Sequence, residues 1–140
     1  MEKFYVTTAI DYVNGPPHVG HAYEKIATDI IAKHYRQRDL EVFFLTGTDE
    51  HGVKIEKTAL SKNITPFEFC DNISSKFKET WKILDITYDR FIRTTEEDHK
   101  KVVQHIFETL LKKGDIYKAS YTGLYCSGCE CFLSPKDLTE

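Results

Sequence analysis

The sequence predicts an α/β fold built on a parallel β-sheet. Apolar, β-branched stretches at residues 3–10 and 41–46 are typical of buried strands, and each is followed by a stretch with helical periodicity. Strand–helix–strand units at this spacing form right-handed parallel sheets, whose ligands bind at the carboxyl ends of the strands. The loops at residues 11–18 and 47–52 both lie at such ends. We therefore expect the functional site between these two loops.

The composition narrows the class of protein. With 140 residues the chain can form one domain with a hydrophobic core, and its net charge of −3 argues against a protein that coats nucleic acid. The sequence has neither a run of about 18 apolar residues nor a secretion leader, so we expect a cytoplasmic protein without a membrane partner. In that compartment its four cysteines favour metal ligands or free thiols over disulfides.

The first two elements are a strand at residues 3–10 and a helix from residue 18 or 19 to about residue 38. Asp11 follows the strand, and we expect it in a solvent-facing turn. The helix carries apolar or partly apolar side chains at a three-to-four spacing, which predicts the face that packs on the sheet. That face comprises Ala22, Ile26, Ile30, Ala32 or Lys33, and Tyr35.

The next elements continue the alternation of strands and helices. A strand at residues 41–46 precedes a helix over about residues 53–62. Thr65 and Glu68 form a capping box around Pro66, so a third helix should start at Pro66 and run to about residue 84.

A short strand at residues 88–93 and a fourth helix complete the predicted α/β region. The helix starts within residues 94–98 and ends at Gly114. From residue 116 the apolar period changes to two, which predicts a small β-rich insertion. The fourth helix carries one broad apolar stripe: Val102, Val103, Ile106, Phe107, Leu110 and Leu111.

The loop before the first helix carries the chemistry of a nucleotide site. His18 and His21 are three residues apart and share one face of the first helical turn, where imidazole and backbone N–H groups can bind phosphate. Gly20 between them leaves room for a flat base, while Asn14 shapes the loop and Pro17 stiffens it. The alternative is that both histidines only cap the helix and face solvent.

Asp49 closes the second strand, beside the expected pocket. A carboxylate at a strand end can bind an ammonium group through a charge-assisted hydrogen bond. The alternative is an N-cap or first-turn acid of the following helix, where Asp is favoured in any case. We assign no role to Glu50 or His51.

Cys126 and Cys129 are separated by two residues in a predicted turn, as in half of a tetrahedral zinc knuckle. A complete site needs four ligands. Cys131 follows too closely to complete the usual geometry, and Cys70 lies on a distant predicted helix. The alternative is a redox pair, which the β-like surroundings disfavour because such pairs start a helix.

Together these motifs resemble the methionyl-tRNA synthetase family. The likeness runs from the first strand to the last residue. It implies a class I synthetase with a Rossmann-like parallel sheet, of which residues 1–115 would form the first half. Residues 116–140 would begin the β-rich zinc-knuckle insertion. The resemblance is carried by residues 7–8, 12–24, 43–52, 91–96 and 123–130.

The same resemblance implies a reaction and a site. The reaction is ATP-dependent activation of L-methionine to methionyl-adenylate, with Mg²⁺ accompanying ATP, followed by transfer to tRNA(Met). His18 and His21 would be catalytic. Cys126 and Cys129 would hold a structural Zn²⁺ whose second ligand pair is not in this chain. ATP would contact Asn14, Pro17, His18, Gly20, His21 and Glu24. Methionine would contact Ala9, Ile10, Tyr12 and Asp49.

Alternative functions stay open. The sequence contains no Lys-Met-Ser-Lys-Ser-like loop, with which class I synthetases of this kind grip the ATP phosphates, so we expect an N-terminal fragment that is inactive alone. One alternative is a non-catalytic nucleotide- and metal-binding remnant. Another is a synthetase for valine, leucine or isoleucine, which would lack the Thr-Asp-Glu-His-Gly segment and the early cysteine pair.

Overall fold

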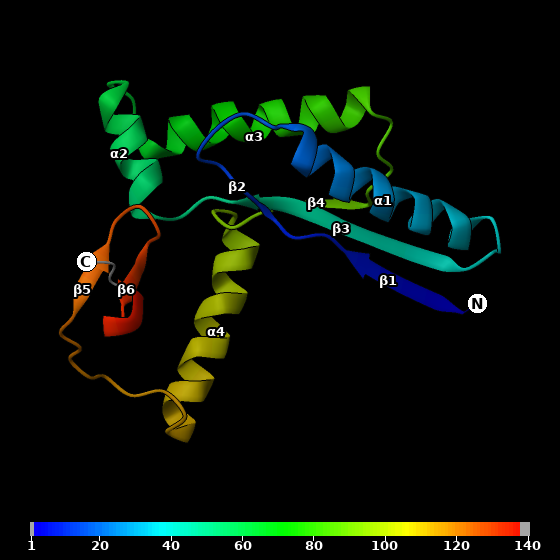
Figure 1. Ribbon diagram of the computed structural model, residues 1–140. Helices are drawn as coiled ribbons and strands as arrows, with labels where there is room; N and C mark the ends of the chain where they lie inside the picture. The colour runs from blue at the N-terminus through cyan, green and yellow to red at the C-terminus, as the bar shows by residue number, and fades with distance from the viewer. Residues whose placement is uncertain (1, 138–140) are drawn as a thin grey trace.

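A computed structural model describes residues 2–137 of the chain, and its main sheet is parallel as the sequence predicts (Figure 1). Two short strands pair one after the other with one edge of β3, and a further strand pairs with the opposite edge. The elements of this sheet are β1 (Lys3–Thr7), β2 (Asp11–Tyr12), β3 (Glu41–Asp49) and β4 (Arg90–Arg93).

The first predicted strand is interrupted. It was expected to run without a break over residues 3–10, but β1 ends at Thr7 and the pairing with β3 resumes only at Asp11. Between them the backbone N–H of Ala9 donates to the Glu24 carboxylate (2.9 Å) and not to the sheet. The Glu24 side chain on the following helix therefore binds a backbone N–H that would otherwise pair with β3. The apolar pattern of a strand does not reveal such a contact.

Helices α1 and α3 lie on one side of the sheet (Figure 1). This placement follows from right-handed crossovers between strands that succeed one another across a parallel sheet. The predicted capping box at the start of α3 is confirmed, with Thr65 Oγ1 accepting from Glu68 N at 3.1 Å. Gly114 ends α4 with a φ of 83°, also as predicted. The helices are α1 (Val19–Arg36), α2 (Val53–Ser61), α3 (Pro66–Ile83) and α4 (Glu97–Lys113).

The core lies between the sheet and these helices, and it includes Phe44 of β3 with Phe77 and Trp81 of α3. Strands β3 and β4 approach each other closely at Gly47. A Cβ atom added there would lie 2.0 Å from the Ile92 carbonyl oxygen. No other residue type fits at this position without moving the strands apart.

The predicted buried face of α1 is correct only in part. Ala32 is buried and Ala22 packs against the core, as predicted. Ile26 and Ile30, however, are 40% and 62% exposed, and Lys25 and Asp29 are buried instead. The inward polar groups are tolerated because each has partners, as buried polar groups require. Asp29, for example, accepts hydrogen bonds from the N–H (2.7 Å) and hydroxyl (2.6 Å) of Thr87 just before β4.

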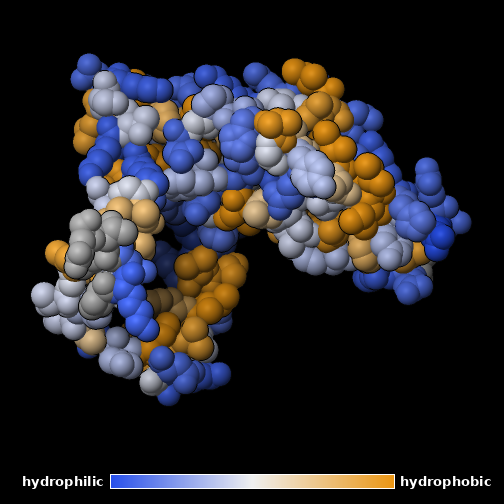
Figure 2. Space-filling view, viewed as in Figure 1, coloured by the Kyte–Doolittle hydropathy of each residue, from blue (hydrophilic) through white to orange (hydrophobic). Residues whose placement is uncertain are grey.

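Helix α4 projects away from the side of the sheet opposite α1 and α3 (Figure 1). None of its residues is buried by the described part of the chain. Figure 2 shows apolar side chains gathered over this helix. They belong to the predicted stripe, in which Val102, Ile106 and Phe107 are each more than half exposed.

The β structure predicted from residue 116 onward begins only at residue 124, with an antiparallel hairpin of β5 (Leu124–Cys126) and β6 (Cys131–Leu133), and the period-two stretch at residues 116–121 forms no strand. A short 3₁₀ turn, η1 (Pro135–Asp137), follows it. The domain boundary at residue 115 stays a prediction. Within the described residues, no helix has the length and apolar character needed to span a membrane.

Candidate active site at the strand ends

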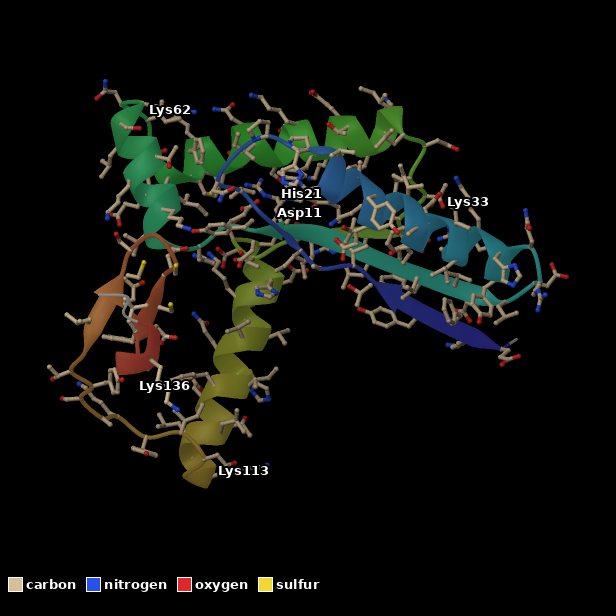
Figure 3. All side chains as sticks on the ribbon, in the orientation of Figure 1. Asp11, His21, Lys33, Lys62, Lys113 and Lys136 are labelled. Atoms are coloured by element: carbon tan, nitrogen blue, oxygen red, sulfur yellow. The ribbon has the colours of Figure 1, made fainter. Side chains whose placement is uncertain are left out.

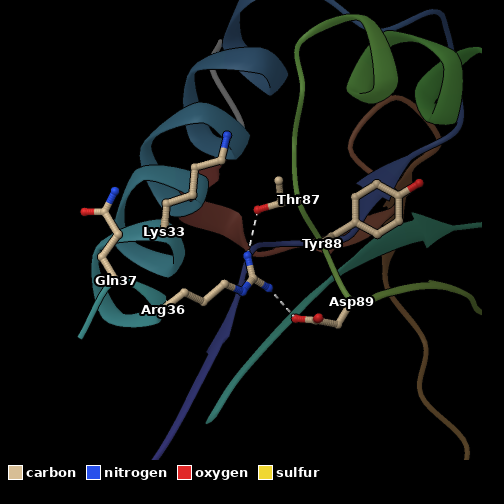
Figure 4. Close-up of a pocket in the computed structure, with 6 residues that line it drawn as sticks. All are labelled: Lys33, Arg36, Gln37, Thr87, Tyr88 and Asp89. Carbon is tan, nitrogen blue, oxygen red and sulfur yellow. Dashed lines mark hydrogen bonds and ion pairs between the residues drawn. The ribbon is translucent and has the colours of Figure 1, made fainter. Parts of the chain in front are cut away.

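A surface hollow of about 570 Å³ lies away from the predicted site, between the end of α1 and the segment before β4 (Figure 4). Its charges already have partners: Arg36 donates to the hydroxyl of Thr87 and to the carboxylate of Asp89, both at 2.7 Å. These contacts are at the amino end of β4, so we assign them to the joining of α1 with the sheet.

The two predicted catalytic histidines form a reciprocal cap at the start of α1. His18 Nδ1 accepts the N–H of Gly20 (3.1 Å), and His21 Nδ1 accepts the N–H of His18 (3.2 Å). The two rings stack with centroids 3.7 Å apart. Because both Nδ1 atoms are acceptors, a neutral imidazole at either position carries its proton on Nε2. Capping thus orients both rings and leaves two N–H donors without a partner among the described residues.

His21 is a neutral donor at neutral pH. Burial lowers its pKa, and the nearby Asp11 carboxylate opposes that shift only in part. The edge of Phe77 contacts the His21 ring at a centroid distance of 5.2 Å. Figure 3 shows His21 and Asp11 together where β2 leads into α1, at the carboxyl ends of the strands.

Gly20 has a local reason to be glycine. A Cβ atom there would lie 3.0 Å from the folded-back ring of His18, so a larger residue would make this ring shift by a few tenths of an ångström. Asn14 is exposed and Pro17 is half-buried in the same loop. Their contacts with ATP, and that of Gly20, stay predictions.

The predicted methionine-binding residues lie on neighbouring strands. Tyr12 of β2 and Asp49 of β3 are register partners, and the Val13 N–H donates to the Asp49 carbonyl oxygen at 3.2 Å. Burial is the main cause that raises the pKa of Tyr12 to about 12, and the hydrogen bond from its hydroxyl to the Glu130 carboxylate is the second. Ala9 and Ile10 lie in the link between β1 and β2, where Ile10 is 37% exposed.

Glu24, predicted to contact ATP, accepts a hydrogen bond from the segment that was predicted to bind methionine. Its carboxylate accepts from Ala9 N (2.9 Å) and from Lys25 Nζ (3.0 Å). Burial tends to raise its pKa, but the hydrogen bond from Ala9 and the Lys25 ammonium lower it overall. A contact of Glu24 with ATP stays a prediction.

The solvent-facing turn expected for Asp11 is wrong. Asp11 is 4% exposed, and its Oδ1 accepts from Lys25 Nζ at 2.6 Å. A carboxylate can be buried when an ammonium group compensates its charge. The sequence placed Lys25 on a helix 14 residues later, and periodicity alone gave no reason to pair the two.

Glu50 is a site residue that the sequence reasoning missed. Its buried carboxylate accepts hydrogen bonds from Arg93 Nε (2.6 Å), Thr95 Oγ1 (2.5 Å) and Thr48 Oγ1 (2.7 Å). Its backbone N–H donates to Thr94 Oγ1 (2.8 Å). The available signal was the Arg-Thr-Thr segment at the carboxyl end of the neighbouring strand, since parallel strand ends meet at one edge.

Thr94, which accepts the backbone N–H of Glu50, also connects this network to Asp49, the carboxylate predicted to bind an ammonium group. Thr94 Oγ1 lies 3.5 Å from Asp49 Oδ1, at the limit of a hydrogen bond. The Glu50 network therefore supports the end of β3 from which Asp49 extends.

The cysteine turn offers two metal ligands. Cys126 Sγ accepts the Cys129 N–H at 3.3 Å, and this contact helps to lower the pKa of Cys126. Cys131 is the register partner of Cys126, and Cys70 is buried in α3. Among residues 2–137 no group of three or more metal-binding side chains converges. The described residues thus fit half of a tetrahedral zinc site.

The parallel α/β sheet with a histidine-capped helix at its strand ends has the fold of a class I aminoacyl-tRNA synthetase. The family model for tRNA synthetases class I (M) matches residues 4–140. The chain belongs to this family, that of methionyl-tRNA synthetase.

Similar proteins carry the same name. Methionine–tRNA ligase of Helicobacter pylori is 50% identical over an alignment of 142 positions, which covers 100% of this chain and 22% of that protein. Methionine–tRNA ligase of Thermotoga maritima is 52% identical over 138 residues, 99% of this chain and 22% of that protein. The chain therefore spans about a fifth of the length of these relatives.

A solved structure shows the same fold. Mycobacterium tuberculosis methionyl-tRNA synthetase in complex with methionyl-adenylate matches with a TM-score of 0.93 and 43% sequence identity. The match covers 97% of this chain and 27% of that chain.

Proposed function

We propose that the protein activates L-methionine with ATP to methionyl-adenylate and transfers the methionyl group to tRNA(Met). The observation that carries this proposal is the pair of Nε2 donors of His18 and His21 at the same edge of the sheet as Tyr12 and Asp49. The histidine N–H donors suit a phosphate, and the pair of Tyr12 and Asp49 suits an amino acid. The names of the relatives support the same substrates.

In the activation step, a carboxylate oxygen of methionine forms a bond to the α-phosphorus of ATP. The bond from this phosphorus to the bridging oxygen breaks, and pyrophosphate leaves with the electron pair. Negative charge grows on the phosphoryl oxygens in the transition state, and preorganised N–H donors stabilise it. His18 and His21 supply such donors without moving, because their Nδ1 atoms are already bound to the backbone.

The amino acid would be held by the strand pair. Asp49 is the carboxylate available to the α-ammonium group, and the Tyr12 ring would contact the thioether, a favourable sulfur–aromatic contact. Glu24 and Lys25 would act indirectly, since they fix Ala9 and its neighbours.

Two metal ions belong to the proposal. Mg²⁺ would accompany ATP. Cys126 and Cys129 would hold a structural Zn²⁺, which stabilises the fold around its ligands when it is bound. Two further ligands would complete the tetrahedral site.

The test is a chimera in which this chain replaces the aligned 138 residues of the Thermotoga maritima ligase. We expect methionine-dependent exchange of pyrophosphate into ATP, and little exchange with valine, leucine or isoleucine. The isolated chain should show no exchange. A folded chimera without exchange would favour the alternative, a nucleotide- and metal-binding chain without catalysis.

A further inference from the structure

A glutamate inside the cysteine turn contacts the proposed methionine site. Glu130 lies between Cys129 and Cys131, yet its carboxylate accepts hydrogen bonds from the Tyr12 hydroxyl (3.0 Å) and the Lys54 backbone N–H (3.1 Å). Tyr12 is 118 residues away along the chain. The contact joins the hairpin β5–β6 to the end of β2 at Tyr12 and to the start of α2. Figure 1 shows this hairpin beside the start of α2.

The backbone at Glu130 is unfavourable for a glutamate. Its φ is 54°, in the left-handed region that favours glycine. If this position served only to turn the chain, glycine would serve it better. What glycine could not supply is the carboxylate with its two hydrogen bonds.

Gly52 allows the Tyr12 hydroxyl to approach this carboxylate. A Cβ atom at Gly52 would lie 2.3 Å from Tyr12 Oη and 3.0 Å from Glu130 Oε1. Gly52 is also the N-cap of α2 and provides no side-chain cap. Glu130 provides one from another element, because its Oε1 accepts the N–H of Lys54 in the first turn.

We propose that Glu130 is a positioning residue that couples the cysteine turn to the methionine site. Through its carboxylate, the conformation of the turn fixes the hydroxyl of Tyr12, whose register partner on β3 is Asp49. Because Glu130 links the turn to Tyr12, methionine bound at Tyr12 should also change how Cys126 and Cys129 are presented to a thiol reagent. This inference rests on the methionine site of the proposed function.

The first test needs no ligand. In the full 140-residue chain with ¹³C-labelled tyrosine, the Tyr12 ring signal is identified by its loss in Tyr12→Phe. Glu130→Gln and Glu130→Gly should both shift this signal. The glycine variant should do so even though glycine adopts the positive φ at this position without strain. Asp137→Asn is the control, because Asp137 lies in the same C-terminal segment and accepts from Ser134. A Tyr12 signal that moves in neither Glu130 variant overturns the proposal.

The second test measures alkylation of Cys126 and Cys129 by iodoacetamide, resolved by peptide mass spectrometry. Saturating methionine should change the alkylation rate in the wild-type chain, and Glu130→Gly should abolish this change. Unchanged rates in a chain that binds methionine overturn the coupling. A chain that binds no methionine in calorimetry contradicts the proposed site instead, and the Tyr12 signal still decides whether Glu130 positions this residue.

Discussion

The ammonium group of Lys25 lies 2.6 Å from Asp11 Oδ1, and both side chains are almost completely shielded from solvent. Lys25 also donates to the carbonyl oxygen of Ala9 (3.1 Å) and to Glu24 (3.0 Å). Burial raises the pKa of Asp11 in spite of the adjacent ammonium. The desolvation of the pair therefore offsets much of its attraction, and its main effect is to fix the segment that leads into β2.

Removal of one partner of the pair of Lys25 and Asp11 should lower the stability of the fold strongly. Lys25→Met leaves the Asp11 carboxylate buried without its cation and should lower the free energy of unfolding by about 3–5 kcal/mol. The measurement is urea unfolding followed by the fluorescence of Trp81, the single tryptophan, which is fully buried.

Removal of both charges should be far milder. Lys25→Met combined with Asp11→Leu should recover most of the loss, because apolar residues of similar volume can replace a buried ion pair. Lys112→Met is the matched control, since its ion pair is exposed, and it should leave stability nearly unchanged. A double variant less stable than Lys25→Met would contradict this account of the pair.

Glu50 should stabilise the fold in a pH-dependent way. Burial alone would raise its pKa, but the hydrogen bonds it accepts, led by that from Arg93, lower the pKa below its usual 4.5. Its contribution is therefore complete above about pH 4.5 and is lost as the pH falls through the folded-state pKa.

The check compares the free energy of unfolding of wild type and Glu50→Gln between about pH 3 and pH 7. The variant should be less stable by about 3 kcal/mol at neutral pH, and the gap should narrow in acid. Glu97→Gln, at an exposed ion pair on α4, serves as the control. A gap that stays constant with pH would show that the Glu50 charge is not what stabilises the strand end.

Gly47 should tolerate no side chain. In Gly47→Ala the new methyl group would lie 2.0 Å from the Ile92 carbonyl, so β3 and β4 would have to separate. We expect a loss of about 1–3 kcal/mol or more in thermal or urea unfolding. Gly15→Ala is the control, because no atom lies within 4 Å of its added Cβ. Equal stabilities of the two variants would disprove the close strand contact.

His21 should contribute mainly to the transition state of adenylation. In the chimera with the Thermotoga maritima ligase, His21→Ala should slow pyrophosphate exchange by about 100- to 1,000-fold while methionine affinity changes little. His105→Ala, at an exposed position of α4, should have no effect. Equal losses in rate and in methionine affinity would argue that His21 binds the ground state.

Much of the fold was predictable because local rules acted without competition. The capping box at Thr65 and Glu68, the glycine stop at Gly114 and the strand–helix alternation all depend on neighbours within a few residues. The start of the first helix at residue 18 or 19 was predictable for the same reason, since the side chains of His18 and His21 cap it within a single turn. The phosphate-binding role of the two histidines stays a prediction.

The polar interior was decided only by tertiary structure. Asp11 with Lys25, and Glu50 with Arg93, are partners 14 and 43 residues apart that hydrophobic periodicity places on the surface. A charged side chain can be inside only when folding brings it a partner, and pattern rules count apolar residues without counting such partners. The link from Glu130 to Tyr12 belongs to this class as well, because the turn that carries the carboxylate meets the strand end only once the chain has folded.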